Sequence, residues 1–371
     1  MGVLLAGIDT LEVGFCVEKY RLADESWAML ESAKTQSQLH SNESLKSSIE
    51  LLGCYFEVLP SGTGRHNLIL RNDDLTLKVR RACSGGEPYP EIQVAFRSSF
   101  LWREGPENAF KLVRKWLEKW AVITRDMVSR ADLAVDIQAP LPRLSRNYRE
   151  VVTRTNHKGC YMKGDFSIGN YTIGLHESGY SFGRGGPIVC RIYDKVIEIE
   201  SHSLKRWFYD LWQANGWKPG SPVIRTEFQL RRKTLRSMQC ETAHDLFAQL
   251  PDLWRYLSQE WLTIRRPGND TNRSRWSISK FWKCIQNGLS KFGKVTGIAR
   301  LKQLKPRIEA LERQAKGIIV SMAALAEGGM GIKRSGKTGC DFVKFKVREW
   351  LADPGLEATV SHRMAKFAAI C

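Results

Sequence analysis

Three short stretches of the sequence, at residues 130–136, 191–195 and 225–230, alternate polar and apolar side chains. Alternate side chains of a β-strand share a face, so each stretch would have one polar and one apolar side. If the three strands lie in one sheet with their apolar sides inward, acids, cations and a tyrosine gather on the other face. The polar positions are Arg130, Asp132, Asp136, Arg191, Tyr193, Lys195, Arg225, Glu227 and Gln229.

The rest of the pattern places these strands in an α+β fold. Further strand-like runs, broken by glycine-containing turns, are expected at 3–16, 54–59, 67–70, 75–81, 91–96, 170–177 and 180–183. Helices are expected at 24–36, 107–122 and 203–214. This order predicts an antiparallel sheet with helices on one face. After about residue 238 helical periodicity takes over, at 243–264, 276–292, 300–326 and 341–351, which predicts a sheet domain at 1–237 and a mainly helical domain at 238–371.

Charge is distributed unevenly along the chain. Residues 1–200 hold 26 Lys or Arg and 25 Asp or Glu, whereas residues 201–371 hold 31 and 14. The imbalance indicates a polyanionic partner, and nucleic acid is favoured over a membrane because no basic amphipathic helix with a clean apolar face stands out. The nine cysteines include no C-x-x-C pair, and neither a signal peptide nor a long apolar segment is recognised. We therefore expect a cytoplasmic protein with reduced thiols and no membrane contact.

The carboxylates of the polar face are candidate metal ligands. Asp132, Asp136 and Glu227 offer the hard oxygen atoms that Mg²⁺ or Mn²⁺ prefers, and such an ion could polarise a phosphodiester. Asp132 and Asp136 stand about 13 Å apart along an extended strand. Asp132 and Glu227 therefore rank first. The alternative is that Arg130–Asp132 and Arg225–Glu227 are ordinary ion pairs of a strand face.

Tyr193 is the candidate nucleophile of the same face. A tyrosinate can attack phosphorus once its pKa, about 10 in an unperturbed side chain, is lowered by nearby cations or a metal. Arg191 and Lys195 flank it at the positions where they would do so. The alternative is a packing tyrosine, in which case Tyr171 and Tyr180 are the reserve candidates.

Taken in order, these three stretches resemble the Rep_trans replication-initiation factors. The family includes rolling-circle initiators of plasmids, relaxases of integrative elements and filamentous-phage replication proteins. The opening Gly-Ile-Asp9-Thr-Leu and the run from Phe96 to Trp102 are most similar to the phage branch, the CTX-type RstA-like proteins. The resemblance covers roughly residues 1–237.

What the resemblance implies is an enzyme that nicks and rejoins DNA at an origin. Tyr193 would be the nucleophile of this transesterase, leaving a 5′-phosphotyrosine and a free 3′-hydroxyl, with Asp132 and Glu227 holding the divalent metal. Asp136 would be an accessory ligand or an orienting group. A homodimer follows from the family and from the single tyrosine, and a host helicase is a candidate partner.

The basic C-terminal part offers candidate DNA contacts. Residues 261–307 contain twelve Lys or Arg and a single acid, Asp270, with aromatic residues interleaved. Cations neutralise phosphates and aromatic rings can stack on bases, although the alternative that the rings form a helix core is favoured. The predicted DNA-binding residues are Arg265, Arg266, Arg273, Arg275, Lys280, Lys283 and Lys337.

Lys337 belongs to a G-x-x-x-x-G-K-T match at residues 331–338. A phosphate-binding loop of an ATPase needs a preceding buried strand and further parallel strands, and the sequence around 331–338 does not predict them. A basic loop that touches DNA phosphates is the favoured interpretation. Two other interpretations of the whole chain stay open: a DNA-binding regulator without chemistry, and a metal-dependent nuclease that uses water.

Overall fold

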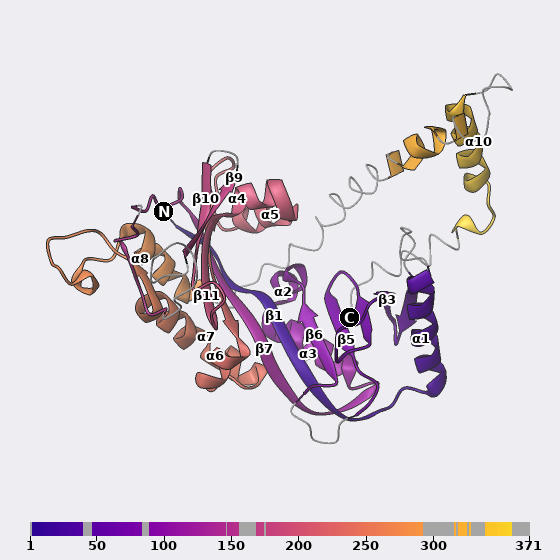
Figure 1. Ribbon diagram of the computed structural model, residues 1–371, viewed down its shortest axis with the longest axis horizontal. Helices are drawn as coiled ribbons and strands as arrows, with labels where there is room; N and C mark the ends of the chain where they lie inside the picture. The colour runs from indigo at the N-terminus through magenta and orange to yellow at the C-terminus, as the bar shows by residue number, and fades with distance from the viewer. Residues whose placement is uncertain are drawn as a thin grey trace. The chain divides into compact units, whose positions relative to one another are not determined.

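The computed structural model describes residues 2–39, 47–83, 89–145, 147–155, 168–173, 176–291, 315–316, 318–324, 326–327 and 338–357. Over these residues the protein has the predicted α+β fold, with one large antiparallel sheet and helices packed against it (Figure 1). None of the described helices is both long and apolar enough to cross a membrane.

The sheet of the described chain has eleven strands, in the order β2-β3-β4-β5-β6-β1-β7-β12-β11-β10-β9. Its centre is formed by two strands of 18 residues, β1 (Val3–Tyr20) and β7 (Ala121–Gln138), which pair antiparallel over almost their whole length. The other strands are β2 (Ser48–Leu51), β3 (Cys54–Val58), β4 (Leu68–Arg71), β5 (Leu75–Val79), β6 (Ile92–Phe96), β9 (Ile168–Ile173), β10 (His176–Phe182), β11 (Ile188–Asp194) and β12 (Val223–Arg231). A separate two-stranded sheet joins β8 (Val151–Thr153) to β13 (Leu262–Ile264).

Helices pack on this framework at several points along the chain. They are α1 (Asp24–Leu39), α2 (Ser98–Glu104), α3 (Pro106–Leu117), α4 (Lys195–Glu198), α5 (Trp207–Gln213), α6 (Arg232–Ser237), α7 (Ala243–Arg255) and α8 (Lys280–Gln286). A π-helical turn, Ile199–Ser203, continues α4, and another, Tyr256–Trp261, continues α7.

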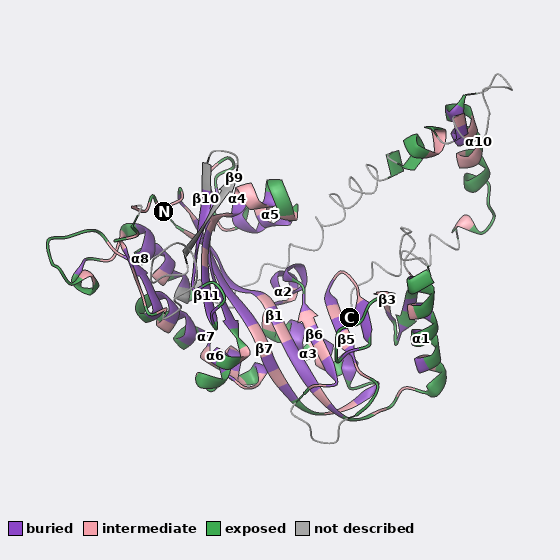
Figure 2. Cartoon of the chain, in the orientation of Figure 1, coloured by how far each residue is buried: buried purple, intermediate pink, exposed green. Residues whose placement is uncertain are grey.

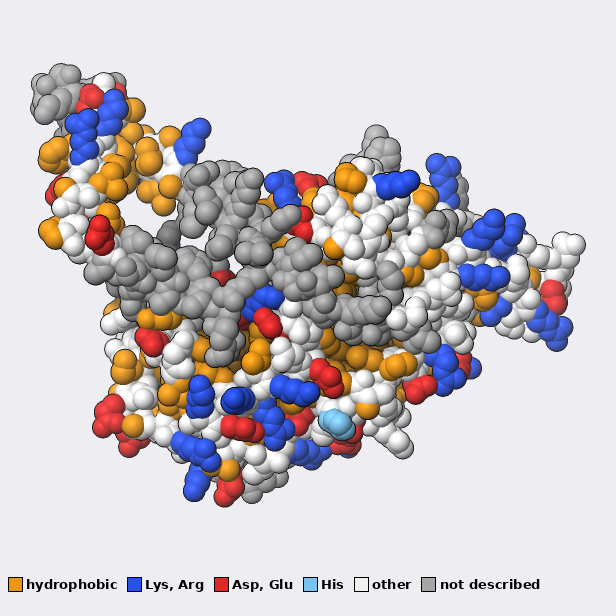
Figure 3. Space-filling model, turned by 180° about the vertical axis from the view of Figure 1, so that it is seen from behind, with side chains coloured by type: hydrophobic (Ala, Val, Ile, Leu, Met, Phe, Trp, Pro, Cys, Tyr) orange, Lys and Arg blue, Asp and Glu red, His pale blue; other side chains and the backbone are white. Residues whose placement is uncertain are grey.

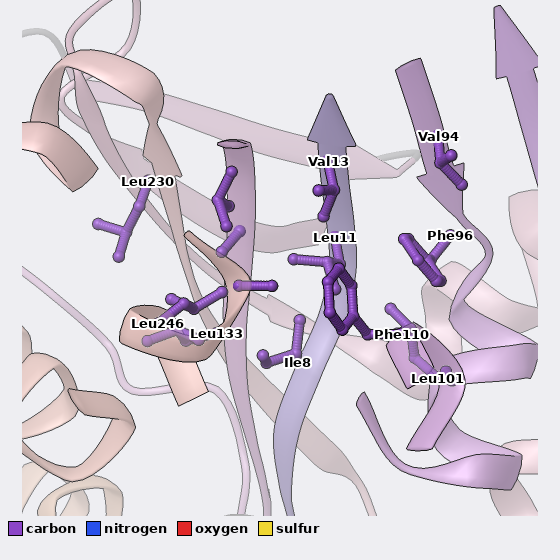
Figure 4. Close-up of a cluster of buried hydrophobic side chains, with 14 of the residues drawn as sticks. Ile8, Leu11, Val13, Val94, Phe96, Leu101, Phe110, Leu133, Leu230 and Leu246 are labelled. Carbon is purple, nitrogen blue, oxygen red and sulfur yellow. The ribbon is translucent and has the colours of Figure 1, made fainter. Parts of the chain in front are cut away.

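The main core lies on the apolar face of the sheet. Leu133 of β7, Leu230 of β12 and Leu11 of β1 point into it, as the alternating pattern predicts (Figure 4). Leu246 of α7 and Phe110 of α3 join them from the covering helices. Burial of these side chains is the main stabilising term for the sheet, at roughly 25 cal/mol per Å² of apolar surface removed from water.

Helices also cover one end of the opposite face, which the prediction of helices on one face did not include. Trp207, Phe208 and Trp212 of α5 pack there in a second apolar cluster with Trp102 of α2 and Leu5 of β1. The polar side of β7 and β12 is therefore buried from the end near α5 as far as Asp132 and Gln229. Intermediate and exposed residues reappear only beyond them, at Arg130 and Arg231 (Figure 2).

The chain divides into two compact units, one spanning Met1–Ala299 with Ile370–Cys371 and the other spanning Arg300–Ala369, which contains α10 (Gly339–Leu351). The functional division at residues 237 and 238 stays a prediction. The segment just after it nevertheless shares the core of the sheet, since Trp254 of α7 and Trp282 of α8 are fully buried there. The helix predicted for 243–264 ends earlier, because Leu262–Ile264 pairs with β8 as a strand.

Candidate active site on the polar face of the sheet

The register brings the three alternating stretches side by side, in the order β7-β12-β11. One row across the strands pairs Tyr193 with Arg225 and Arg225 with Asp136. In the next row Arg191 lies opposite Glu227, and one row farther Gln229 lies opposite Asp132. The alternation therefore predicts the shared face, and antiparallel pairing supplies the neighbours.

Glu227 links the candidate nucleophile to a cation. The Tyr193 hydroxyl donates a hydrogen bond of 3.2 Å to Glu227 Oε2, while Arg191 donates one of 2.8 Å to Glu227 Oε1. Arg191 also donates to Gln229 Oε1 at 2.7 Å. The carboxylate is thereby held under the phenol, within reach of its proton.

Asp132 is the second carboxylate of this part of the polar face and is only 1% exposed. Arg130 holds both of its oxygens, with Nε 2.8 Å from Oδ1 and Nη2 2.5 Å from Oδ2. Burial raises the pKa of Asp132 to about 7; the Arg130 hydrogen bonds oppose the rise, and the neighbouring Glu227 carboxylate adds to it. The two acids lie on neighbouring strands and interact electrostatically; that they form one site stays a prediction. Arg130–Asp132 is also the ion pair that the alternative interpretation expects.

The pKa of Tyr193 moves in the direction opposite to the one predicted. Burial raises it well above its ordinary value, the Glu227 carboxylate raises it further, and Arg225 opposes both. The free phenol is therefore protonated, and attack requires a base to accept its proton as the new bond forms. Glu227 is the carboxylate in hydrogen-bond contact.

Asp136 is engaged elsewhere, at the closed end of the face. Arg225 donates to its two oxygens at 2.6 and 2.8 Å, and Trp212 Nε1 donates to Oδ2 at 2.9 Å. With an exposure of 1%, the carboxylate is enclosed by these partners. The arrangement fits the orienting role of Asp136 and not the role of a metal ligand. The expected Arg225–Glu227 ion pair is likewise replaced by Arg225–Asp136.

Asp9 completes this buried network, and pattern analysis of the polar stretches does not find it. It accepts hydrogen bonds of 2.8 Å from Arg225 Nη1, from Trp102 Nε1 and from the Ser98 hydroxyl. Burial alone would raise its pKa, but the Arg225 cation holds that pKa well below its usual range. The signal in the sequence is an acid that directly follows the apolar run Val3–Ile8 of the first strand. Such an acid needs a buried partner.

Lys195 lies just beyond the strand predicted to carry it. β11 ends at Asp194, which caps α4 by accepting from the backbone N–H groups of Val196 and Ile197, so Lys195 is the first helical residue. Its Nζ is 2.5 Å from Glu198 Oε2 and 5.6 Å from the centre of the Tyr193 ring. Burial and the Arg225 cation lower the pKa of Lys195. The ammonium group lies over the face of the tyrosine ring.

The strand β10 can approach Tyr193 closely because residue 179 is a glycine. Gly179 of β10 pairs with Tyr193, and a Cβ at this position would lie 2.7 Å from Tyr193 Cβ and 2.6 Å from the Ile192 carbonyl oxygen. Any larger residue would push the tyrosine from its place. The close approach of β10 thus fixes where the phenol stands.

The polar face offers two carboxylates, Asp132 and Glu227, as candidate metal ligands, and no larger group of ligands in the described part of the chain. Among the described residues, no group of three or more His, Cys, Asp or Glu side chains is arranged to hold an ion. Mg²⁺ is commonly held by one or two carboxylates, with water and substrate phosphate completing its shell. Asp132 and Glu227 therefore fit a divalent ion, on the condition that Arg130 and Arg191, each about 30% exposed, yield part of their contact.

The predicted DNA-binding residues lie around α8 and the loop before it. Arg266, Arg275, Lys280 and Lys283 are exposed, and Arg273 is partly so. Arg265 is structural, because its guanidinium donates to the Trp276 carbonyl and to the Thr263 hydroxyl. The interleaved aromatics belong to the core, as the favoured interpretation predicts: Trp261, Trp276, Phe281 and Trp282 are all buried. Lys337 lies outside the described residues.

A scan of protein-family models and a search of the curated proteins find no match for the chain. Among solved structures, it is similar to one titled as a rolling circle replication initiator protein from Geobacillus stearothermophilus, with 17% identity and a TM-score of 0.43. The similarity covers 77% of this chain and 96% of that one. A likeness at this level carries no argument about activity, which has to be argued from the site.

Proposed function

We propose that the protein is a rolling-circle replication initiator that nicks one DNA strand at an origin through Tyr193 and later rejoins it. The observation that carries the proposal is the hydrogen bond from the Tyr193 hydroxyl to Glu227, with Asp132 in the adjacent row of the same polar face. A nucleophile, a base in contact with it and a second acid are the groups that phosphodiester transfer requires.

In the proposed reaction, the Tyr193 oxygen forms a bond to the scissile phosphorus while the bond from phosphorus to the 3′-oxygen breaks. The phenolic proton passes to Glu227, and the departing 3′-oxygen takes up a proton from solvent water to become the hydroxyl that primes synthesis. The 5′-phosphotyrosine keeps the phosphodiester linkage for the reverse step, which rejoins the strand. Arg191, which contacts Glu227 Oε1, would orient the other carboxylate oxygen toward the phenol.

Asp132 and Glu227 would hold Mg²⁺ or Mn²⁺. When bound, the ion would supply Lewis-acid polarisation of the phosphate and compensate the charge that develops on its oxygens. Because a metal takes over the role of a compensating cation, it would also favour the ionised form of Asp132. Arg130 would then be available to contact the phosphate as a second positive group.

Further parts of the proposal follow from the single tyrosine. Ending a replication round requires a second nucleophile, so we propose that the protein acts as a homodimer on single-stranded or extruded origin DNA. The cations around α8, together with Lys337, are proposed DNA contacts. A host helicase would be needed to unwind the strand ahead of the free 3′-hydroxyl.

The test is incubation of the full chain with end-labelled single-stranded origin DNA and Mn²⁺, followed by a denaturing gel. We expect a nick and a protein–DNA adduct with the natural chain, and neither with Tyr193→Phe, while DNA binding stays within about twofold. Tyr180→Phe is the matched control, because Tyr180 is a buried tyrosine whose hydroxyl bonds the Pro142 carbonyl.

Two rival functions predict other results. A regulator that only binds DNA gives neither nick nor adduct with the natural chain. A nuclease that uses water gives a nick without an adduct, and Tyr193→Phe then leaves cleavage intact. Either pattern would contradict the role of Tyr193.

A further inference from the structure

A dense basic surface lies at the end of β12, outside the residues expected to bind DNA. It consists of Arg125, Arg231, Arg232, Lys233 and Arg236, with Glu241 as the acid among them, and we call it the α6 basic surface. Arg231, Lys233 and Arg236 are exposed, and α6 forms the wall of a shallow open hollow lined by Arg232, Lys233, Arg236, Ser237 and Glu241. Five cations around one acid attract an extended anion.

Part of this surface is structural and part faces solvent. Arg232 ties α6 to the sheet, since its Nη1 donates to the carbonyl oxygens of Val128 and Glu241 at 3.0 and 2.9 Å. Glu241 lies 2.6 Å from Arg125, but 3.7 Å from Arg236. The single acid is thus drawn mainly to Arg125, which leaves the positive potential of the exposed side of α6 largely uncompensated.

The strand β12 connects this surface to the candidate active site. Glu227 and Arg231 are four residues apart on the same face of β12, or roughly 13 Å along the strand. Arg231 pairs with Arg130 across the sheet, and Arg130 contacts Asp132. A continuous line of positive groups therefore runs from the two acids past Arg231 to α6. Figure 3 shows the molecule from the side opposite Figure 1, where Lys and Arg side chains are interspersed with Asp and Glu side chains.

We infer that the α6 basic surface binds the phosphate backbone of the single DNA strand that enters or leaves the candidate active site. The inference rests on the proposed function for the identity of the anion. Backbone contacts of this kind carry no sequence information; they set the path and the register of the strand relative to Tyr193.

The experiment neutralises the exposed cations and leaves Arg232 in place. In the full chain, Arg231→Gln, Lys233→Gln and Arg236→Gln are combined, and binding of a fluorescein-labelled single-stranded oligonucleotide is followed by anisotropy over a range of salt concentrations. The matched control combines Lys34→Gln, Arg65→Gln and Arg81→Gln. These three exposed or partly exposed cations belong to the side of the sheet formed by β3 to β5 and α1, several strands from β12.

The α6 variant should bind on the order of tenfold more weakly at low salt. Its plot of log affinity against log salt should be shallower by about 2, as expected for three lost phosphate contacts, whereas the control keeps the natural slope. A second variant, Glu241→Gln, should bind more tightly, because it removes the negative charge of the surface without removing a cation.

Equal affinity and equal salt slope in the α6 variant and the natural chain would overturn the inference. So would an equal loss in the control, which would show a response to net charge alone. Tyr193→Phe separates this result from the proposed function, because it should lose the covalent adduct and keep DNA binding. If the α6 variant binds DNA more weakly but still forms the adduct at saturating DNA, the surface and the nucleophile are supported independently. If the α6 variant binds DNA as well as the natural chain and also forms the adduct, only the inference about the α6 basic surface is refuted, and the proposed function stands.

Discussion

At the scale of single residues, the acids of the polar face fall into two groups that differ in the arginine they contact. Asp136 and Asp9 are neutralised by the fully buried Arg225, so they serve the structure. Asp132 and Glu227 contact arginines that are partly exposed and can yield to a ligand. All four carboxylates are buried, so the difference lies in their arginines: Arg225 is fully enclosed, whereas Arg130 and Arg191 are about 30% exposed and can be reached by a substrate.

The buried network gives a stability prediction. Arg225→Ala leaves the Asp136 and Asp9 carboxylates buried without their cation, and should lower the free energy of unfolding by about 3–5 kcal/mol in urea denaturation. Arg206→Ala, which removes an exposed ion pair with Glu200, should cost less than about 1 kcal/mol. Similar losses for the two variants would show that the network does not support the fold.

At the scale of elements, the strand β10 positions the nucleophile through a glycine. Gly179→Ala places a methyl group 2.7 Å from Tyr193 Cβ, so the phenol must move away from Glu227. We expect nicking to fall by about tenfold or more, because small displacements of reacting groups carry large rate penalties. The measurement is the single-turnover nicking rate, with the melting temperature recorded for each variant.

Gly64→Ala is the matched control, since a Cβ there meets open space. It should leave the nicking rate unchanged. Unchanged nicking in Gly179→Ala as well would mean that the position of Tyr193 relative to Glu227 is not critical.

The strands of the site could be predicted from the sequence because a period of two is a local signal. Alternation alone indicates which side chains of β7, β11 and β12 share a face. The ion-pair partners could not be predicted, because Arg225 is 216 residues from Asp9 and 89 residues from Asp136 in the sequence. The end of β11 could not be predicted for a similar reason: Asp194 caps a helix, which moves Lys195 out of the strand pattern.

At the scale of the whole molecule, the sheet has helices on both faces, and the polar face is open only in part. The apolar cluster of α5 and α2 covers the end of the polar face that carries Asp136. Asp132 and Glu227 lie farther along the strands, next to the more exposed part. From there the positive groups continue along β12 to α6. The segment after residue 238, expected as a separate domain, supplies α7 and α8 to the sheet's core on the opposite face.

The raised pKa of Asp132 predicts how stability of the metal-free protein depends on pH. The pKa is about 7 in the fold and about 4 in an unfolded chain. The unfolded chain therefore loses its proton first, and the stabilisation present below pH 4 is lost as pH rises toward 7. Asp132→Asn, which cannot ionise, should flatten the difference in free energy of unfolding between about pH 4 and pH 7. Parallel curves for the two proteins, measured with a chelator present, would contradict the assignment.

The most direct test of the central claim is the identity of the residue that becomes linked to DNA. After reaction of the natural chain with single-stranded origin DNA and Mn²⁺, the adduct would be digested with nuclease and protease and sequenced by mass spectrometry. We expect the residual nucleotide on the peptide that contains Tyr193. A nucleotide on Tyr171, Tyr180 or another residue would contradict the account, as would cleavage that leaves no modified peptide.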